Sequence, residues 1–245
     1  MKRISLVIPA YNEEKLIKKT LIKLHNFIKK DDLKWEILMV NDGSTDNLLK
    51  VLEEFKPRFF KIVSYKKNKG KGFAIKKAMN YASEDFIGFI DSDLAYSFEN
   101  LKKALSKLET ADICIGSRSL TKESNEQTSI LRKFLGKGFN ILSKIILGHH
   151  LGDTQCGLKV FKKDVAKDLF SNQTLQGFSF DTEILYIAKK RKYLIKTIDA
   201  TVLKEHLDKK SKVNLFLDPI KMFLDLIKIK LNDIQGKYER DTFKF

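Results

Sequence analysis

The stretch FIGFIDSDLAYSFENLKKALSKL (86–108) carries the pattern that decides the fold. Its opening segment, 86–91, is mostly apolar and predicts a short buried strand, whereas 97–108 spaces its apolar residues three or four positions apart and predicts a helix. Between them the strand delivers two carboxylates, Asp91 and Asp93, to its end. Because a buried ionised carboxylate is costly without a cation or hydrogen-bond donors, we expect such a partner at this strand end.

The same unit of a strand followed by a helix recurs along the first half of the chain. Further strands are predicted at the apolar runs 4–10, 35–41, 59–65 and 111–117. Amphipathic helices are predicted between them, at 13–30, 45–55 and 70–82. Strands that alternate with helices predict an α/β fold with a Rossmann-like, doubly wound, mostly parallel sheet. Ligands of such a sheet bind beyond the C-terminal ends of the strands.

Polar clusters follow three of these strands, at 11–13, 41–44 and 91–93. The topology predicts that they converge at one edge of the sheet. A dinucleotide-binding turn of the type G-x-G-x-x-G does not follow the first strand, and the segment NKGKG (68–72) lacks the spacing of a P-loop. The sequence therefore predicts neither a dinucleotide-binding turn nor a P-loop, although the glycines and lysines of 68–72 can still line a diphosphate.

Bulk composition bounds the class of protein. The chain has 245 residues, of which 43% are hydrophobic and 32% charged, and this composition predicts a soluble globular protein. No run reaches the roughly 18 consecutive apolar residues of a membrane span. The N-terminal segment, 1–14, is interpreted as a first strand rather than a signal peptide. Two cysteines, Cys114 and Cys156, fit a reducing cytosol better than a disulfide framework. The net charge of +16 fits either a solvated lysine-rich surface or attraction to phosphate-bearing partners.

The regular alternation ends near residue 118. A helix that covers 130–147 sets an apolar stripe opposite Lys133, Lys137 and Lys144, and a last helix near 214–232 has a similar stripe. Each of these peripheral amphipathic helices either packs on the core or docks on an anionic membrane surface. Composition shows no linker, so we expect a single domain.

The carboxylates of Asp91 and Asp93, two positions apart at a strand end, suit one Mg²⁺ or Mn²⁺ ion whose other ligands are water and phosphate oxygens. The same pair is common as a turn or cap before a helix, here the one near Ser97. Both interpretations remain open at this level.

Taken in order, the polar clusters extend into a longer series. The stretches are VIPAYNEE (7–14), VNDGSTD (40–46), NKGKGFAIKKAM (68–79), FIDSD (89–93), GSR (116–118), DTQCGLKVF (153–161), FDTEILYIA (180–188) and, more weakly, SK (211–212). This series resembles the family-2 glycosyltransferases of GT-A fold, and within them the dolichyl-phosphate β-glucosyltransferase and dolichyl-phosphate mannosyltransferase branch. The arginine that the glucosyltransferase-like members usually carry before FDTE is missing here, where 176–179 reads QGFS.

The resemblance implies one glycosyltransferase domain over 1–245, with a nucleotide-sugar-binding half (1–118), an acceptor half (119–213) and a C-terminal amphipathic helix and tail (214–245). It implies inverting transfer of a sugar to polyprenyl or dolichyl phosphate, with Mg²⁺ or Mn²⁺. UDP-glucose is the preferred donor and GDP-mannose the next. The expected place is the cytoplasmic face of a membrane, bound peripherally.

Two other functions remain open. One is a family-2 transferase that extends a polysaccharide or protein glycan, and the other a basic non-enzymatic module that binds nucleic acid or membrane. The chain has no recognised nucleic-acid motif, so we do not expect a nucleic-acid partner. Oligomeric state cannot be read from the sequence.

The resemblance also implies roles for single residues. Asp93, Asp153 and Arg118 are the predicted catalytic residues, and Asp91 and Asp93 the predicted metal ligands. Nucleotide-sugar binding is expected from Pro9, Tyr11, Glu13, Asp42, Lys71, Asp91, Ser92, Gln155 and Lys212. Asp181 and Glu183 are secondary candidates.

Structural roles compete with several of these. Glu13 suits the start of a helix, Asp42 and Asp153 suit turns, and Lys71 suits a solvated face.

Overall fold

The computed structural model describes residues 2–55, 57, 59–117, 130–148, 156–200 and 217–239. Its centre is a sheet of seven strands in the order β3-β2-β1-β4-β6-β5-β7. The strands are β1 (Arg3–Ala10), β2 (Lys34–Asp42), β3 (Phe60–Tyr65), β4 (Phe86–Phe89), β5 (Ile113–Ser117), β6 (Lys159–Lys162) and β7 (Ile195–Asp199). Every pairing among these strands is parallel except those of β6 with β4 and β5. The predicted mostly parallel α/β sheet is confirmed.

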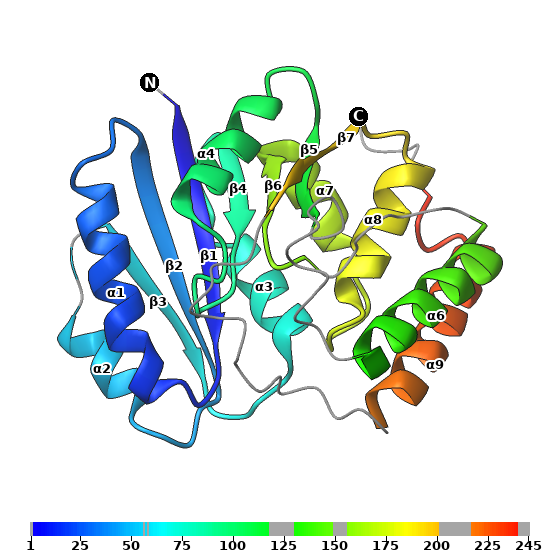
Figure 1. Ribbon diagram of the computed structural model, residues 1–245, viewed down its shortest axis with the longest axis horizontal. Coiled ribbons are helices and arrows are strands. Elements are labelled where there is room, and N and C mark those ends of the chain that lie inside the picture. Colours follow the sequence, from blue (N-terminus) through cyan, green and yellow to red (C-terminus); the bar gives the residue numbers. More distant parts are fainter. Residues whose placement is uncertain are drawn as a thin grey trace.

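Helices cover both faces of the sheet (Figure 1). They are α1 (Glu14–Ile28), α2 (Leu48–Glu54), α3 (Lys71–Met79), α4 (Phe98–Lys107), α6 (Ile130–Leu147), α7 (Lys163–Ser171), α8 (Phe180–Lys190) and α9 (Leu217–Ile234). One hydrophobic cluster joins α1, α2 and α4 to the sheet, and a second joins α3, α7, α8 and α9 to the opposite face. Successive strand residues point to opposite faces, so continuous apolar strands serve both clusters.

Strand β6 was not predicted, because its sequence KVFK is only four residues long and it lies at the end of a segment, 152–161, that was interpreted as a polar loop. Three of its residues are nevertheless buried, since β6 lies between β4 and β5. Its antiparallel direction brings its N-terminal end to the edge where β4 and β5 end. The predicted acceptor half (119–213) thus contributes two strands, β6 and β7, to the same sheet as the first half. The division of the chain into halves stays a prediction.

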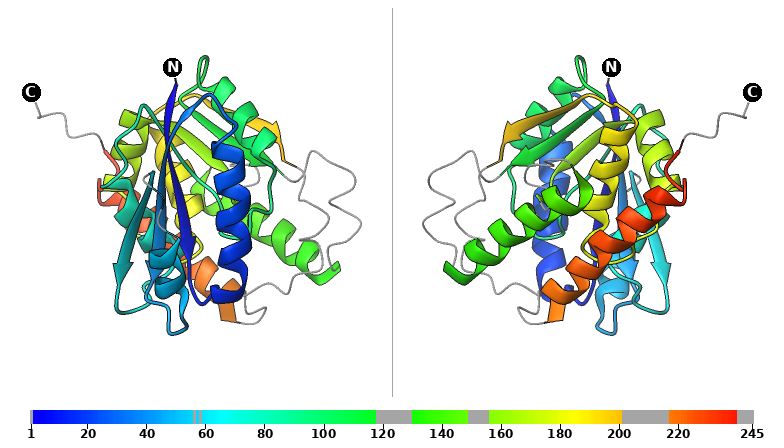
Figure 2. Two further views of the ribbon diagram at one scale, coloured as in Figure 1. Left: turned by 90° about the vertical axis from the view of Figure 1, so that its left-hand side faces the viewer. Right: turned by 90° about the vertical axis from the view of Figure 1, so that its right-hand side faces the viewer.

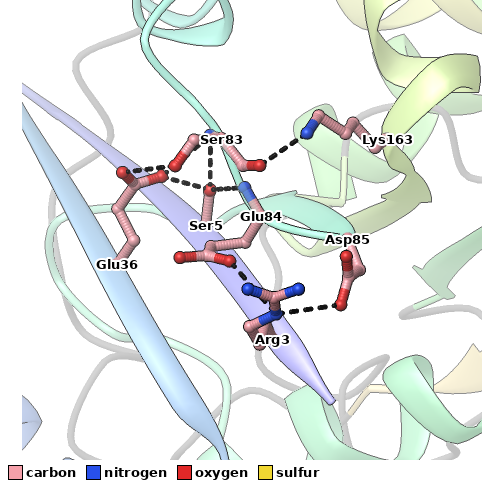
Figure 3. Close-up of polar contacts among 7 residues, drawn as sticks. All are labelled: Arg3, Ser5, Glu36, Ser83, Glu84, Asp85 and Lys163. Atoms are coloured by element: carbon pink, nitrogen blue, oxygen red, sulfur yellow. Dashed lines mark hydrogen bonds and ion pairs between the residues drawn. The ribbon is translucent and has the colours of Figure 1, made fainter. Parts of the chain in front are cut away.

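At the opposite edge of the sheet a polar network ties together the N-terminal ends of the strands (Figure 3). The buried carboxylate of Glu36 on β2 accepts hydrogen bonds from the Ser5 hydroxyl on β1 and from the backbone N–H (3.0 Å) and hydroxyl (2.9 Å) of Ser83. Lys61 on β3 forms an ion pair with the same carboxylate. Burial raises the pKa of Glu36, but these donors outweigh it and leave the pKa below its usual range. This network stabilises the edge that faces away from the predicted site.

The two long outer helices, α6 and α9, contact each other and lie side by side at the surface (Figure 2). In α9, Leu226 and Ile229 are fully buried. The stripe predicted for this helix consists of Phe216, Ile220, Phe223, Ile227 and Leu231. Phe216 lies outside the described residues, and the other four are 36–60% exposed. The apolar stripe read from the sequence is therefore not the core-facing side of α9. No helix in the described ranges is long and apolar enough to span a bilayer.

Candidate active site

Loops from β1, β2 and β4 meet at the C-terminal edge of the sheet, as predicted. The first two loops are tied directly: the Asn12 N–H donates to Ser44 Oγ (3.0 Å), and the Thr45 N–H donates to Asn12 Oδ1 (2.8 Å). Asn12 has a positive φ of 51°, a conformation that asparagine tolerates better than most residues. Each loop therefore fixes the position of the other.

Asp42, at the end of β2, organises the loop that leads into α3. Its carboxylate accepts hydrogen bonds from the backbone N–H groups of Lys69 (2.8 Å) and Gly70 (2.9 Å) and from the side chain of Asn68 (3.0 Å). Gly70 has φ of 95°, which favours glycine, and it places Lys71 at the start of α3. Asp42 thus shapes the wall of the site by holding the loop 68–70, rather than through the turn at its own position that the sequence suggested. Its predicted contact with the nucleotide stays a prediction.

Asp91 and Lys71 meet at the centre of this edge. Lys71 Nζ lies 2.5 Å from Asp91 Oδ1, and the Lys71 side chain is only 18% exposed, so it does not belong to a solvated face. The other carboxylate oxygen, Oδ2, packs on Gly157, where an added Cβ would lie only 2.0 Å from it. Both oxygens of Asp91 therefore have a close neighbour, one cationic and one steric.

Beneath this pair lies a second one, between Asp181 at the start of α8 and Lys159 at the start of β6. Their charged atoms are 2.6 Å apart, and the side chains are 5% and 0% exposed. Lys159 also donates to the Cys156 carbonyl (2.7 Å) and lies over the Phe89 ring. The four charged side chains Asp91, Lys71, Asp181 and Lys159 form a group of alternating sign, named here the charge chain.

The charge chain shifts the pKa values of Lys71 and Asp181. Burial alone would lower the pKa of the Lys71 ammonium, but the negative charges of Asp91 and Asp181 outweigh burial and raise it. Burial raises the pKa of Asp181, and Lys159 and Lys71 offset part of that rise. Lys71 is thereby held as a cation at the edge of the sheet.

The second predicted metal ligand, Asp93, is half-buried in the turn that leads from β4 towards α4. Its Oδ1 accepts a hydrogen bond from the Ala95 N–H (3.1 Å), and Ser97 caps α4 by accepting from the Asn100 N–H (3.2 Å). The turn role considered for this pair is thus present for Asp93. Ser92 is nearly buried, and its carbonyl accepts a hydrogen bond from Thr20 Oγ1 (2.6 Å) of α1.

The other candidates from the first loop lie at the same edge. Pro9 is buried near the end of β1, Tyr11 is 37% exposed directly after it, and Glu13 precedes the first turn of α1. Their predicted contacts with the nucleotide stay predictions. Four candidates lie outside the described residues: Arg118, Asp153, Gln155 and Lys212.

Sequence reasoning missed Lys159 and the role of Gly157. A lysine between the apolar residues of GLKVF was the available signal, because a charge within a buried run indicates a buried partner.

The secondary candidate Glu183 lies away from the charge chain. Its fully buried carboxylate accepts hydrogen bonds from Thr174, from the Leu175 N–H (2.8 Å) and from the Tyr238 hydroxyl (2.6 Å), which fixes the loop before α8.

The carboxylates of Asp91 and Asp93 suit a divalent cation, but two side chains do not complete its set of ligands. Asp91 is 37% exposed at its side chain, and both acids supply the hard oxygen atoms that Mg²⁺ and Mn²⁺ prefer. Within the described ranges no three acidic, histidine or cysteine side chains cluster as a complete metal site. A cation at this edge would thus draw its remaining ligands from a bound phosphate and water.

Solved structures of similar fold include mannosyl-3-phosphoglycerate synthase from Rubrobacter xylanophilus. The match has a TM-score of 0.70 and 16% identity, and it covers 100% of this chain and 77% of the other. A glucosyl-3-phosphoglycerate synthase from Mycobacterium tuberculosis, solved with Mn²⁺, UDP and glucosyl-3-phosphoglycerate, matches with a TM-score of 0.62 and 18% identity over 96% of this chain and 80% of the other. These matches confirm the predicted GT-A fold.

Curated relatives are more similar in sequence. A dolichyl-phosphate beta-glucosyltransferase from Trichomonas vaginalis is 35% identical over 92% of this chain and 72% of its own length. The enzyme of the same name from Saccharomyces cerevisiae is 34% identical over 98% of this chain and 78% of its own length. The family model described as glycosyl transferase family 2 matches residues 5–170, which contain most of β1, all of β2 to β6, and Asp91, Asp93 and Lys71. The chain therefore belongs to glycosyl transferase family 2 and is a glycosyltransferase.

Proposed function

We propose that this enzyme transfers glucose from a nucleotide sugar, UDP-glucose by preference, to a dolichyl-type polyprenyl phosphate at a membrane surface. The observation that carries the proposal is the ion pair of Asp91 with Lys71 at the C-terminal edge of the sheet, two residues from Asp93. The chain is also 34% identical to a named dolichyl-phosphate beta-glucosyltransferase over 98% of its length. GDP-mannose is the second donor that we expect.

The chemistry of the acceptor fits this arrangement of side chains. A phosphate oxygen is already anionic at neutral pH, so the enzyme needs less help from a general base than it would with a sugar hydroxyl. The greater need is to stabilise the negative charge of the departing nucleoside diphosphate. The Lys71 ammonium, which lies at the site edge and is kept charged by Asp91 and Asp181, is a cationic donor for that charge.

We propose Asp91 and Asp93 as ligands of Mg²⁺ or Mn²⁺. When bound, such a cation supplies Lewis-acid stabilisation of the diphosphate leaving group. Asp93 keeps its position through its hydrogen bond from the Ala95 N–H, while Asp91 is oriented by Lys71 and Gly157. Asp153 remains the proposed residue near the sugar and the acceptor, and Arg118 remains a proposed contact of the diphosphate or the acceptor phosphate.

The decisive test incubates the purified protein with labelled UDP-glucose or GDP-mannose, polyprenyl phosphate and Mg²⁺ or Mn²⁺. We expect label in the organic phase with UDP-glucose, and loss of that label with EDTA or in Asp93→Ala. Label that enters only water-soluble glycans would refute the lipid acceptor and favour the polysaccharide alternative. Greater transfer from GDP-mannose would refute the preferred donor while leaving the reaction class intact.

The proposed membrane surface is the outer side of α6 and α9. Exposed apolar side chains there include Ile141, Ile145, Ile220, Leu224, Leu231 and Ile234, at 52–72% exposure. Lys144, Lys221 and Lys228 are exposed on the same two helices. Apolar side chains flanked by lysines suit an interface with anionic lipid, to which each lysine adds about 1 kcal/mol. Attachment to the cytoplasmic face, where Cys114 and Cys156 would stay reduced, belongs to the same proposal.

Liposome flotation tests this surface. We expect the protein to float with vesicles that contain phosphatidylserine, and less so in Ile145→Ser/Leu224→Ser. Ile22→Ser is the matched control, because Ile22 is 53% exposed on α1, away from α6 and α9. Equal flotation of the double variant and the control would contradict docking through α6 and α9.

A further inference from the structure

Asp91 has a resident cation before any ligand arrives. Lys71 Nζ lies 2.5 Å from Asp91 Oδ1, which is within the range of a direct ion pair, and Asp91 Oδ2 packs on Gly157. A divalent cation that binds Asp91 therefore competes with Lys71 for the same carboxylate. The competition is strong because the Lys71 side chain is only 18% exposed, which limits screening by water.

The backbone position of Lys71 is also fixed by its neighbours on either side in the chain. Lys71 is the first residue of α3, and the Asp42 carboxylate binds the two backbone N–H groups that precede it. Gly72 packs against the Gln176 carbonyl and Phe180, where an added Cβ would lie 2.9 Å and 2.7 Å away. The helix start therefore cannot retreat, so displacement of Lys71 from Asp91 must occur by rotation of its side chain.

A displaced ammonium needs another anion, because an unpaired charge with little exposure is costly. Asp181 is the nearest alternative in the charge chain, but Lys159 already neutralises it at 2.6 Å. Asp91 and Asp181 are the two described carboxylates whose charges raise the pKa of Lys71, so the diphosphate of a bound donor is the partner left for a displaced ammonium. Lys71 thus has a good partner after displacement only when the nucleotide is present.

We infer that Lys71 is a resident counter-ion of Asp91 that couples the binding of the divalent cation to the binding of the nucleotide diphosphate. With no nucleotide, Lys71 opposes the cation at Asp91. With nucleotide bound, Lys71 moves to the diphosphate and leaves Asp91 to the cation. This inference rests on the proposed use of Asp91 as a metal ligand, and it adds that Lys71 discourages binding of the cation alone.

The test measures binding without acceptor or turnover. Mn²⁺ binding to the full chain is followed by electron paramagnetic resonance with and without UDP, for wild type, Lys71→Met and Lys71→Arg. In wild type we expect UDP to tighten Mn²⁺ binding by roughly 5- to 150-fold, the usual range of such coupling. In Lys71→Met we expect Mn²⁺ alone to bind about tenfold tighter, because the competing charge is gone. The enhancement by UDP should then fall at least about threefold, although direct contact between Mn²⁺ and phosphate keeps part of it.

Lys69→Met is the matched control. Lys69 is exposed in the same loop, two residues away, and its ammonium lies over the Phe73 ring at 4.4 Å rather than beside Asp91. It removes the same formal charge, so a general electrostatic effect would appear equally in both variants. Lys71→Arg should retain weak binding of Mn²⁺ alone, because it keeps a cation at the position. Circular dichroism checks that each variant is folded.

The outcomes separate this inference from the proposed function. If wild type binds neither UDP nor Mn²⁺, the proposed function fails and the inference fails with it. If wild type binds both ligands, but Mn²⁺ alone binds Lys71→Met no more tightly than Lys69→Met, only the inference is overturned. Tighter binding of Mn²⁺ in Lys71→Met alone, with a smaller enhancement by UDP, supports it.

Discussion

Gly157 is the position where one added methyl group should disable the site without removing a functional group. In Gly157→Ala the new Cβ would lie 2.0 Å from Asp91 Oδ2 and 2.7 Å from Asp91 Cγ. The carboxylate must retreat by about 1.4 Å to regain an ordinary contact of 3.4 Å. A misplacement of about 1 Å can cost on the order of 10²-fold in rate. We therefore expect the rate of glucosyl transfer to fall about 100-fold, which corresponds to about 2.7 kcal/mol.

The assay pairs turnover with thermal unfolding, because crowding at a buried position also costs about 1–3 kcal/mol of stability. For a chain of this size that cost lowers the Tm by roughly 2–4 °C per kcal/mol. Gly177→Ala is the control, since nothing lies within 4 Å of an added Cβ at that position. Wild-type turnover in Gly157→Ala, with the protein folded, would show that the position of Asp91 does not matter for the reaction.

Three further predictions concern stability and the metal. In Asp181→Asn the free energy of unfolding, measured by urea denaturation, should fall by about 3–5 kcal/mol because Lys159 is left buried without its counter-charge. The double variant Asp181→Leu/Lys159→Met should recover most of that loss. A double variant as unstable as the single one would contradict this. Glu36 has a pKa lowered from 4.5, so its contribution to stability is present above about pH 4.5 and disappears as the pH falls through the lower pKa of the folded state. Glu36→Gln should therefore have a smaller change in Tm between pH 3 and 6 than wild type, and an unchanged slope would count against the network. Asp93→Ala should weaken Mn²⁺ binding in the presence of UDP by about tenfold or more, measured by electron paramagnetic resonance, and wild-type affinity would exclude Asp93 as a ligand.

The sheet was predictable because its first strands are long and apolar and each is followed by an amphipathic helix. The predicted strand 35–41 differs from β2 (Lys34–Asp42) by one residue at each end. Strand β6 was not predictable in the same way, since four residues with lysine at both ends have no period of their own. Its place is set by pairing with β4 and β5, which are far away in sequence.

The site was predictable as a set of strand ends and not as a set of contacts. Alternation of strands and helices brings Asp42 and Asp91 to one edge, but it does not reveal that Lys71 neutralises Asp91 or that Lys159 lies beneath. Such pairings depend on side-chain direction across the sheet. The same limit applies to α9, where helical spacing marks an apolar stripe but does not say that Leu226 and Ile229 take the core and leave Ile220 outside.

The reversed direction of β6 also has a consequence for how this enzyme can diverge. Because β5 ends and β6 begins at the same edge, the two ends of the intervening segment meet: an added Cβ on Gly116 would lie 2.6 Å from Cys156 Sγ, and the Gly116 N–H donates to the Leu158 carbonyl (2.9 Å). A segment with adjoining ends can lengthen at a cost of only about 0.6 kcal/mol per doubling. Insertions between β5 and β6 can therefore be accommodated during divergence without a change in the register of the sheet.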